Sequence, residues 1–237
     1  MKIKIIANPK KSWARALARD AALLLKRSGH RIVKRGADAT VCIGGDGTIL
    51  YANHQKRIEG AVLGIGSAKS YICQARRQAW RGRLPGILKR KRVVRLMTLD
   101  CSIGKRRYNA MNDFVVHATH FRVAELTVSA SAGRRVSFEG DGVIVSTPLG
   151  SAAYAYSAGG IKMPPAQRKI SIVPICPYKR AFSPSVLPQG GTVGIIPGRD
   201  CAFIVDGIYV RRLRKGEAVR IAKGKDITLF EGVGRYD

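Results

Sequence analysis

A glycine turn stands between a buried strand and the start of a helix near the beginning of the chain. The apolar run 37–43 predicts the strand, the turn is Gly44-Gly45-Asp46-Gly47-Thr48, and a helix is expected over 49–53. Backbone N–H groups that are free at a helix start, together with the helix dipole, favour a bound anion. Glycine permits the turn and lets a phosphate approach the backbone closely. We therefore expect a phosphate site here.

Asp46 is the one carboxylate in this turn. It would repel a bare phosphate, so its presence indicates a second role, either binding a metal or taking a proton. The alternative interpretation is a tight turn in which Asp46 caps the helix. The spacing of the residues leaves both interpretations open.

The pattern of apolar residues changes along the chain. Up to about residue 92, short apolar runs alternate with helical patterns, which predicts a parallel sheet covered on both faces. From residue 93 onward, short β-rich runs are separated by glycine and proline, which predicts a mostly antiparallel β-sandwich. We therefore expect an α/β domain over 1–92 that carries the phosphate turn, and a β-rich domain over 93–237.

The balance of charge is strongly basic. The 237 residues include 43 Lys and Arg against 15 Asp and Glu, a formal net charge of +28, which favours polyanionic partners. The basic residues are spread along the chain, with local clusters only at 76–77, 89–92 and 211–212, and no aromatic platform for bases is visible. A solvated basic surface is therefore favoured over a dedicated nucleic-acid interface.

No apolar run is long enough to span a bilayer, and the N-terminus lacks the apolar core of a signal peptide. We expect a cytoplasmic protein without a membrane partner. The five cysteines are widely spaced and form no CxxC pair, so neither a zinc site nor a disulfide framework is predicted. His117 and His120 alone make a weak metal site, and no protein-held metal is predicted.

Three later stretches carry polar residues that a β core does not need. Asn112-Asp113 opens an apolar strand, and Asp141 precedes the apolar run 142–148. A small-residue segment, 151–158, follows and is helical in propensity. Its start would present N–H groups and hydroxyls to a ligand. Asp206-Gly207 is instead interpreted as a hairpin turn, the commonest use of that dipeptide.

These residues carry a family resemblance. The motifs at 44–48, 112–113, 141–148 and 150–160 resemble the NAD kinase family, in its archaeal form. The first motif is shared with diacylglycerol, sphingosine and phosphofructo-kinases, whereas the stretch from 141 to 160 is far more specific. The resemblance implies a Rossmann-like or phosphofructokinase-like α/β domain followed by a β-sandwich domain, with the site between them.

The resemblance also implies an activity. A phosphoryl group would pass from ATP or inorganic polyphosphate to the 2′-hydroxyl of the adenosine ribose of NAD, giving NADP. Mg²⁺ would bridge the donor phosphates, and the protein would be a homodimer or homotetramer. Asp46 would be the catalytic base, with Gly44, Gly45, Gly47 and Thr48 on the donor phosphates. The implied NAD-binding residues are Asn112, Asp113, Asp141, Ser151, Ala152, Ala153, Tyr154 and Ser157.

The chain departs from the family pattern at Leu149 and Ala152, where the family usually has threonine, and in the loop 64–72. Two alternatives therefore stay open. One is a kinase of the same fold that phosphorylates another hydroxyl compound. The other is a basic module that binds nucleic acid, which the net charge alone supports.

Overall fold

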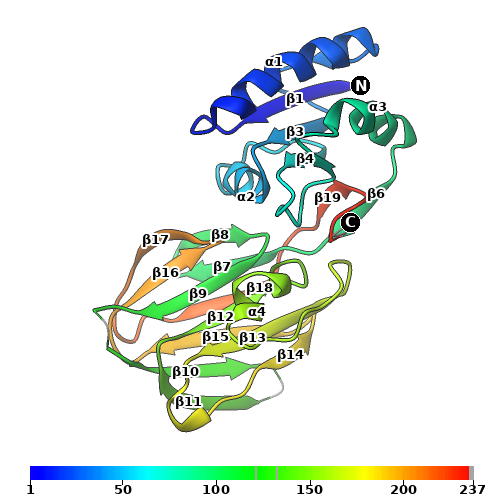
Figure 1. The fold of residues 1–237 in the computed structure, drawn as a ribbon. Helices are drawn as coiled ribbons and strands as arrows, with labels where there is room; N and C mark the ends of the chain where they lie inside the picture. The colour runs from blue at the N-terminus through cyan, green and yellow to red at the C-terminus, as the bar shows by residue number, and fades with distance from the viewer. Residues whose placement is uncertain (121, 132, 235–237) are drawn as a thin grey trace. The chain divides into compact units, whose positions relative to one another are not determined.

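The computed structural model describes residues 1–120, 122–131 and 133–234, and the chain divides into two compact units (Figure 1). Unit 1 comprises Met1–Leu96 and the C-terminal segment that begins at Ile227. Unit 2 comprises Met97–Asp226. Among the residues described, no helix is long and apolar enough to cross a membrane.

Unit 1 is built on one mixed sheet with the strand order β2-β1-β3-β4-β19-β6, and β5 pairs with β4. Every pair is parallel except β19 with β6. The strands are β1 (Lys2–Ala7), β2 (Arg31–Ile32), β3 (Ala39–Ile43), β4 (Ala61–Gly66), β5 (Ala75–Arg76), β6 (Val93–Leu96) and β19 (Ile227–Phe230). The helices are α1 (Ser12–Arg27), α2 (Asp46–His54) and α3 (Trp80–Arg90).

One hydrophobic core joins helices α1 and α3 to this sheet. The buried residues of α1 recur every three or four positions, which places them on one face of the helix. They are Ala14, Leu17, Ala21 and Leu25. All five residues of β3 are buried, as expected for a central parallel strand. The predicted α/β domain with a parallel sheet is confirmed.

The boundaries of the units differ from the expected division at residues 92 and 93. Strand β19 pairs with β4 and β6, so the chain returns to the sheet of unit 1 after completing unit 2. Leu229 and Phe230 are buried, and Phe230 belongs to the core of unit 1. The expected β run over 93–103 is likewise split, because β6 lies in unit 1 and the following strand lies in unit 2.

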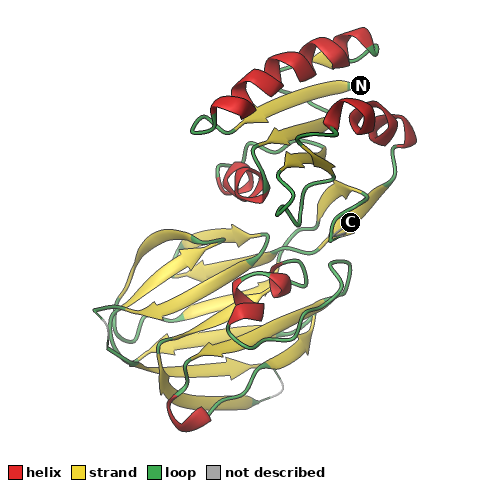
Figure 2. Cartoon of the chain, in the orientation of Figure 1, coloured by secondary structure: helices red, strands yellow, loops and turns green. Residues whose placement is uncertain are grey.

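Unit 2 consists of two antiparallel sheets, which confirms the predicted β-sandwich (Figure 2). The strand orders are β11-β10-β15-β18-β7-β8 and β14-β13-β12-β9-β16-β17. The first sheet contains β7 (Leu99–Ile103), β8 (Arg106–Ala110), β10 (Ala124–Ala130), β11 (Arg134–Gly140), β15 (Thr192–Pro197) and β18 (Val219–Lys223). The second contains β9 (Asp113–Ala118), β12 (Gly142–Ser146), β13 (Lys169–Ile175), β14 (Ser185–Pro188), β16 (Cys201–Val205) and β17 (Ile208–Leu213).

The core of unit 2 lies between the facing sides of its sheets. On β12, Val143 and Val145 point into that core, whereas Ile144 points to the other face. There Ile144 packs with Ala155 of the short helix α4 (Tyr154–Ser157). Because both faces of β12 are covered, the strand is a continuous apolar run rather than an alternating one.

The return of β19 generates a test. Phe230→Ala should destabilise unit 1 by about 3–5 kcal/mol, the usual cost of removing a buried aromatic ring. Both tryptophans, Trp13 and Trp80, lie in unit 1, so their fluorescence reports its unfolding in urea. The control is Leu23→Ala, because Leu23 is 57% exposed. An unchanged midpoint for Phe230→Ala would show that the segment does not support unit 1.

Candidate functional site

The turn between β3 and α2 requires glycine at two positions. Gly44 has φ +147°, and a Cβ there would lie 2.3 Å from Oγ1 of Thr48 and 2.6 Å from Cβ of Asn8. Gly45 has φ +98°, in the region that side chains other than glycine rarely adopt. The backbone of this turn is therefore bare at the start of α2, as the sequence predicts.

Asp46 is the first residue of α2, but it does not cap the helix. The N-cap residue is Gly45, and no side chain makes a capping hydrogen bond there. The Asp46 carboxylate instead accepts three backbone N–H groups from the loop that follows β4. Tyr71 donates to Oδ2 at 2.6 Å, whereas Ile72 and Cys73 donate to Oδ1 at 2.9 and 3.2 Å. Asp46 therefore holds a second loop against the glycine turn.

Two residues of this site were missed by the sequence analysis. Nζ of Lys11 donates to the carbonyl oxygen of Gly44 at 2.6 Å, and Nδ2 of Asn8 donates to Oγ1 of Thr48 at 3.3 Å. Both residues follow β1, whose last residue pairs with the last residue of β3. The sequence could have indicated both residues, because they follow a predicted strand and ligands of parallel sheets bind beyond the carboxyl ends of the strands. Lys11 adds a cation to the expected phosphate turn.

In unit 2, Asp206 organises the backbone around Asn112. Asp206 and Gly207 join β16 to β17 with φ +50° and +77°, so the predicted hairpin turn is confirmed. The Asp206 carboxylate also accepts the backbone N–H groups of Met111, Asn112 and Asp113, at 3.0, 2.7 and 3.2 Å. This second role was not predicted, because the partners are 93 to 95 residues away in the sequence.

The backbone of Met111 and Asn112 is also held by residues 147–150. Thr147 donates its hydroxyl to the carbonyl oxygen of Met111 at 2.6 Å, and its N–H to that of Asn112 at 2.8 Å. Gly150 is so close that a Cβ there would lie 2.2 Å from the Asn112 carbonyl oxygen. Within the described residues, the buried Oδ1 of Asn112 has no hydrogen-bond partner. A buried acceptor of this kind fits a ligand that brings a donor.

Two predicted NAD-binding carboxylates of unit 2, Asp113 and Asp141, both act electrostatically on Tyr154. Asp113 is only 4% exposed, and burial, with a smaller contribution from Asp206, raises the pKa of its carboxyl to about 7. Burial and the charges of Cys176, Asp141 and Asp113 raise the pKa of Tyr154. A hydrogen bond to Asp141 raises the pKa of the Cys176 thiol. Asp113 and Asp141 thus each act on Tyr154, although the two carboxylates lie at opposite ends of the paired strands β9 and β12.

The predicted helix over 151–158 is shorter and interrupted. A 3₁₀ turn, Gly150–Ala152, precedes α4, and Ala153 lies between them with non-helical dihedral angles. The Ser151 hydroxyl is fully buried, donates to Pro148 at 2.7 Å and accepts the N–H of Met163 at 2.8 Å. Ser151 therefore shapes this turn instead of offering its hydroxyl to a ligand.

The other predicted residues of this stretch are more accessible. Ala153, Tyr154 and Ser157 are exposed, and Ala152 is half-buried. Their contacts with NAD stay predictions. Asp46 and the glycine turn belong to unit 1, whereas every predicted NAD-binding residue belongs to unit 2.

The raised pKa of Asp113 predicts a dependence of stability on pH. An unfolded aspartate has a pKa of about 3.9. Between about pH 4 and pH 7 the folded chain therefore keeps a proton that the unfolded chain releases, so this group makes the free energy of unfolding fall as pH rises. Asp113→Asn should gain stability relative to wild type across that window, measured by urea unfolding at several pH values. A constant difference between the two proteins would contradict the buried-acid assignment.

Comparison with known sequences places the chain in a family. A model of the ATP-NAD kinase C-terminal domain matches residues 111–230. The NAD kinase of Thermoplasma acidophilum is 30% identical over 93% of this chain and 83% of its own length. The NAD kinase of Thermomicrobium roseum is 30% identical over 84% of this chain and 73% of its own length.

Solved structures agree in fold. An NAD kinase from Archaeoglobus fulgidus, crystallised in complex with ATP, superposes with a TM-score of 0.83 at 21% identity, covering 98% of this chain and 94% of that one. Yeast NADH kinase complexed with NADH gives a TM-score of 0.80 at 20% identity, covering 97% of this chain and 83% of that one. From the matched family model and these relatives, we conclude that the chain belongs to the NAD kinase family.

Proposed function

We propose that this protein is an NAD kinase, which transfers the terminal phosphoryl group of ATP to the 2′-hydroxyl of the adenosine ribose of NAD. The 2′-oxygen forms a bond to the γ-phosphorus as the bond from that phosphorus to ADP breaks. The hydroxyl proton passes to Asp46. The products are NADP and ADP, and inorganic polyphosphate is a second candidate donor.

The observation that carries this proposal is the geometry of Asp46. An ionised carboxylate offers about four acceptor positions on two oxygens. Three backbone N–H groups occupy Oδ1 twice and Oδ2 once, and a further hydrogen bond comes from the Cys73 thiol, a weak donor that the hydroxyl of a substrate would displace. Because the carboxylate is fixed to a loop and to a helix start, it is held in place before the acceptor binds.

The donor phosphates are assigned to the turn of Gly44, Gly45, Gly47 and Thr48. Bare backbone at the start of α2 and the Lys11 ammonium both favour an anion at that point. Phosphoryl transfer needs alignment and neutralisation of charge more than covalent help from the protein. Lys11 is therefore added to the residues assigned to the donor.

The acceptor is assigned to unit 2. The unpartnered Oδ1 of Asn112 would accept a hydrogen bond from the adenosine part of NAD, with Asp113 beside it. Asp141, whose charge raises the pKa of Tyr154, would contact the nicotinamide part, and Tyr154 would contact the dinucleotide. Ala152, Ala153 and Ser157 complete the proposed surface.

Mg²⁺ is assigned to the phosphates and not to a cage of protein ligands. The described residues contain no group of three His, Cys, Asp or Glu side chains that could hold a metal ion. Mg²⁺ in kinases commonly has one or two carboxylates with the rest of its shell from phosphates and water. When bound, it would neutralise charge on the donor phosphates. We also propose a cytoplasmic homodimer or homotetramer, on the family resemblance alone.

Asp46→Asn tests the assigned base. It should lower kcat by about 10²–10⁴-fold, the usual value of general-base catalysis, and change the KM for NAD much less. The assay follows NADP formed from ATP, Mg²⁺ and NAD. The matched control is Ser70→Ala, which removes the acceptor of the Ser67 N–H in the same loop but keeps the carboxylate. Near-full activity of Asp46→Asn, or an equal loss in the control, would refute the assignment.

A second pair of variants tests the acceptor. Asp141→Ala should raise the KM for NAD by about tenfold or more, because hydrogen bonds to charged groups contribute ~1.5–3 kcal/mol. Ala152→Thr should lower it only a few fold, because a neutral hydrogen bond contributes ~0.5–1.5 kcal/mol. Glu125→Ala, which removes an exposed carboxylate on β10, is the control. Unchanged NAD kinetics in both test variants would favour another acceptor.

A further inference from the structure

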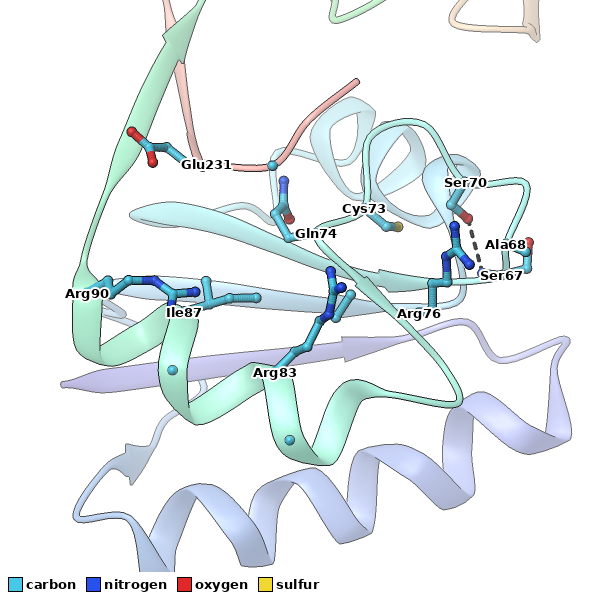
Figure 3. Close-up of a pocket in the computed structure, with 14 residues that line it drawn as sticks. Ser67, Ala68, Ser70, Cys73, Gln74, Arg76, Arg83, Ile87, Arg90 and Glu231 are labelled. Carbon is cyan, nitrogen blue, oxygen red and sulfur yellow. Dashed lines mark hydrogen bonds between the residues drawn. The ribbon is translucent and has the colours of Figure 1, made fainter. Parts of the chain in front are cut away.

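The basic pockets of unit 1 differ in how they relate to the site described above. One has a volume of about 390 Å³ and lies beside β5 and α3 (Figure 3). Cys73 lines it, and the N–H group of Cys73 donates to the Asp46 carboxylate, so this pocket adjoins the glycine turn. Another has a volume of about 940 Å³ and lies between β1, β2, the loop after β2 and the loop after α2. We call it the basic groove, and its charged lining residues are Lys4, Lys34, Arg35, Lys56, Arg57 and Glu59.

The charges of the basic groove do not cancel. Nζ of Lys4 donates to Oε1 of Glu59 at 2.6 Å, and the N–H of Ala37 donates to Oε2 at 2.9 Å. The carboxylate in the lining is therefore already paired. The four other cations of the lining are exposed, and their side chains make no hydrogen bond or ion pair with any residue that the structure describes. Each of these four charges is available to an anion that enters the groove.

The basic groove continues into a basic stretch of the chain. Residues 26–35 include five Lys and Arg, one His and no acidic residue. Lys26, Arg27 and Arg31 of this stretch are exposed, and the chain leads from them along β2 into the loop that lines the groove. The sequence analysis did not identify this surface, because residues 56–57 join it only in the fold. Cations spread along such a surface suit an extended polyanion better than a single ion.

The rest of the lining indicates the kind of polyanion. No described residue of the groove is aromatic, so an unpaired base would find no ring on which to stack. The apolar lining residues are Ile5, Ile32 and Val33, and none of them is a strongly exposed side chain. A protein partner or a membrane would therefore find no apolar anchor in the groove. A nucleic-acid duplex needs only cations for its backbone, and its bases are already stacked.

We propose that the basic groove binds the sugar–phosphate backbone of a nucleic-acid duplex without regard to base sequence. The proposal goes beyond the proposed function, because neither the binding nor its test requires NADP formation. The groove and the glycine turn lie at opposite ends of α2. The helix begins at Asp46 and ends at His54, two residues before Lys56. Its nine residues span about 13 Å, so the duplex is assigned to a surface separate from the donor phosphates.

The first experiment separates a site from diffuse charge. The full chain is titrated into a fluorescent DNA duplex of mixed sequence, and anisotropy is measured between about 0.05 and 0.2 M salt. Each lost phosphate contact reduces the slope of log K against log salt by about 0.9. Lys34→Ala/Arg35→Ala should therefore reduce the slope by about 1.8 and weaken binding about tenfold or more. The matched control, Arg106→Ala/Arg107→Ala, also removes two adjacent exposed cations, but from β8 in unit 2.

The control decides between the two interpretations. An equal loss in Arg106→Ala/Arg107→Ala would show that the charge acts diffusely and would overturn the proposal. Absence of binding by the wild type at the lower salt concentration would do the same. Lys56→Ala/Arg57→Ala should weaken binding as much as the first double variant, because its cations line the same groove.

Further measurements identify the ligand and guard against misfolding of a variant. Duplexes of different sequence should bind equally well, and a preference for one sequence would contradict backbone binding. A poly-glutamate peptide should bind more weakly because its charge density is lower, and binding as tight as that of the duplex would point to an acidic protein instead. In the wild type, the duplex should slow hydrogen exchange of amides in 31–36 and 56–60. Protection confined to 44–48 would place the duplex on the glycine turn and overturn the proposal.

Discussion

The hydrogen bonds from the loop 71–73 to Asp46 hold the site of unit 1 together. Each charge-assisted bond contributes ~1.5–3 kcal/mol, enough to fix a loop that has little regular structure of its own. The Asp46 carboxylate therefore has two roles, since it holds the loop 71–73 and is also the proposed proton acceptor. The Cys73 thiol also hydrogen-bonds to this carboxylate, and a substrate hydroxyl would have to displace that weak donor. Any change at this position therefore alters the loop as well as the proposed proton acceptor.

In unit 2 the carboxylate of Asp206 holds a segment of backbone in the same way. Asp206 also accepts three consecutive backbone N–H groups, and it does so from a left-handed conformation that costs on the order of 1–3 kcal/mol. That cost is offset by the bonds to Met111, Asn112 and Asp113. Here the structural and ligand-facing roles fall on separate residues. Asp206 fixes the backbone, and the side chains of Asn112 and Asp113 are left to the proposed acceptor.

The sequence predicted the helices and strands better than the long-range contacts between them. Alternating strands and helices, and then short β runs, predicted both sheet types because periodicity reports which faces are buried. The motifs also predicted roles for Asp46, Asn112 and Asp141, and these roles stay predictions. The bonds from Asp46 span 25 to 27 residues and those from Asp206 span 93 to 95, and no local pattern encodes them. The pairing of β19 with β4 is equally non-local, so its run was assigned to the wrong unit.

The positions of the charged side chains matter more than the net charge of the chain. With 43 basic and 15 acidic residues, at least 28 cations cannot each have a carboxylate of their own. Exposed charges separated by more than about 8 Å are largely screened at physiological salt, so most of this surplus adds little at any one point. Arg76 and Arg90 are 14 positions apart in the sequence, yet β5 and α3 bring both to one pocket. Where the fold gathers cations in this way, their fields add.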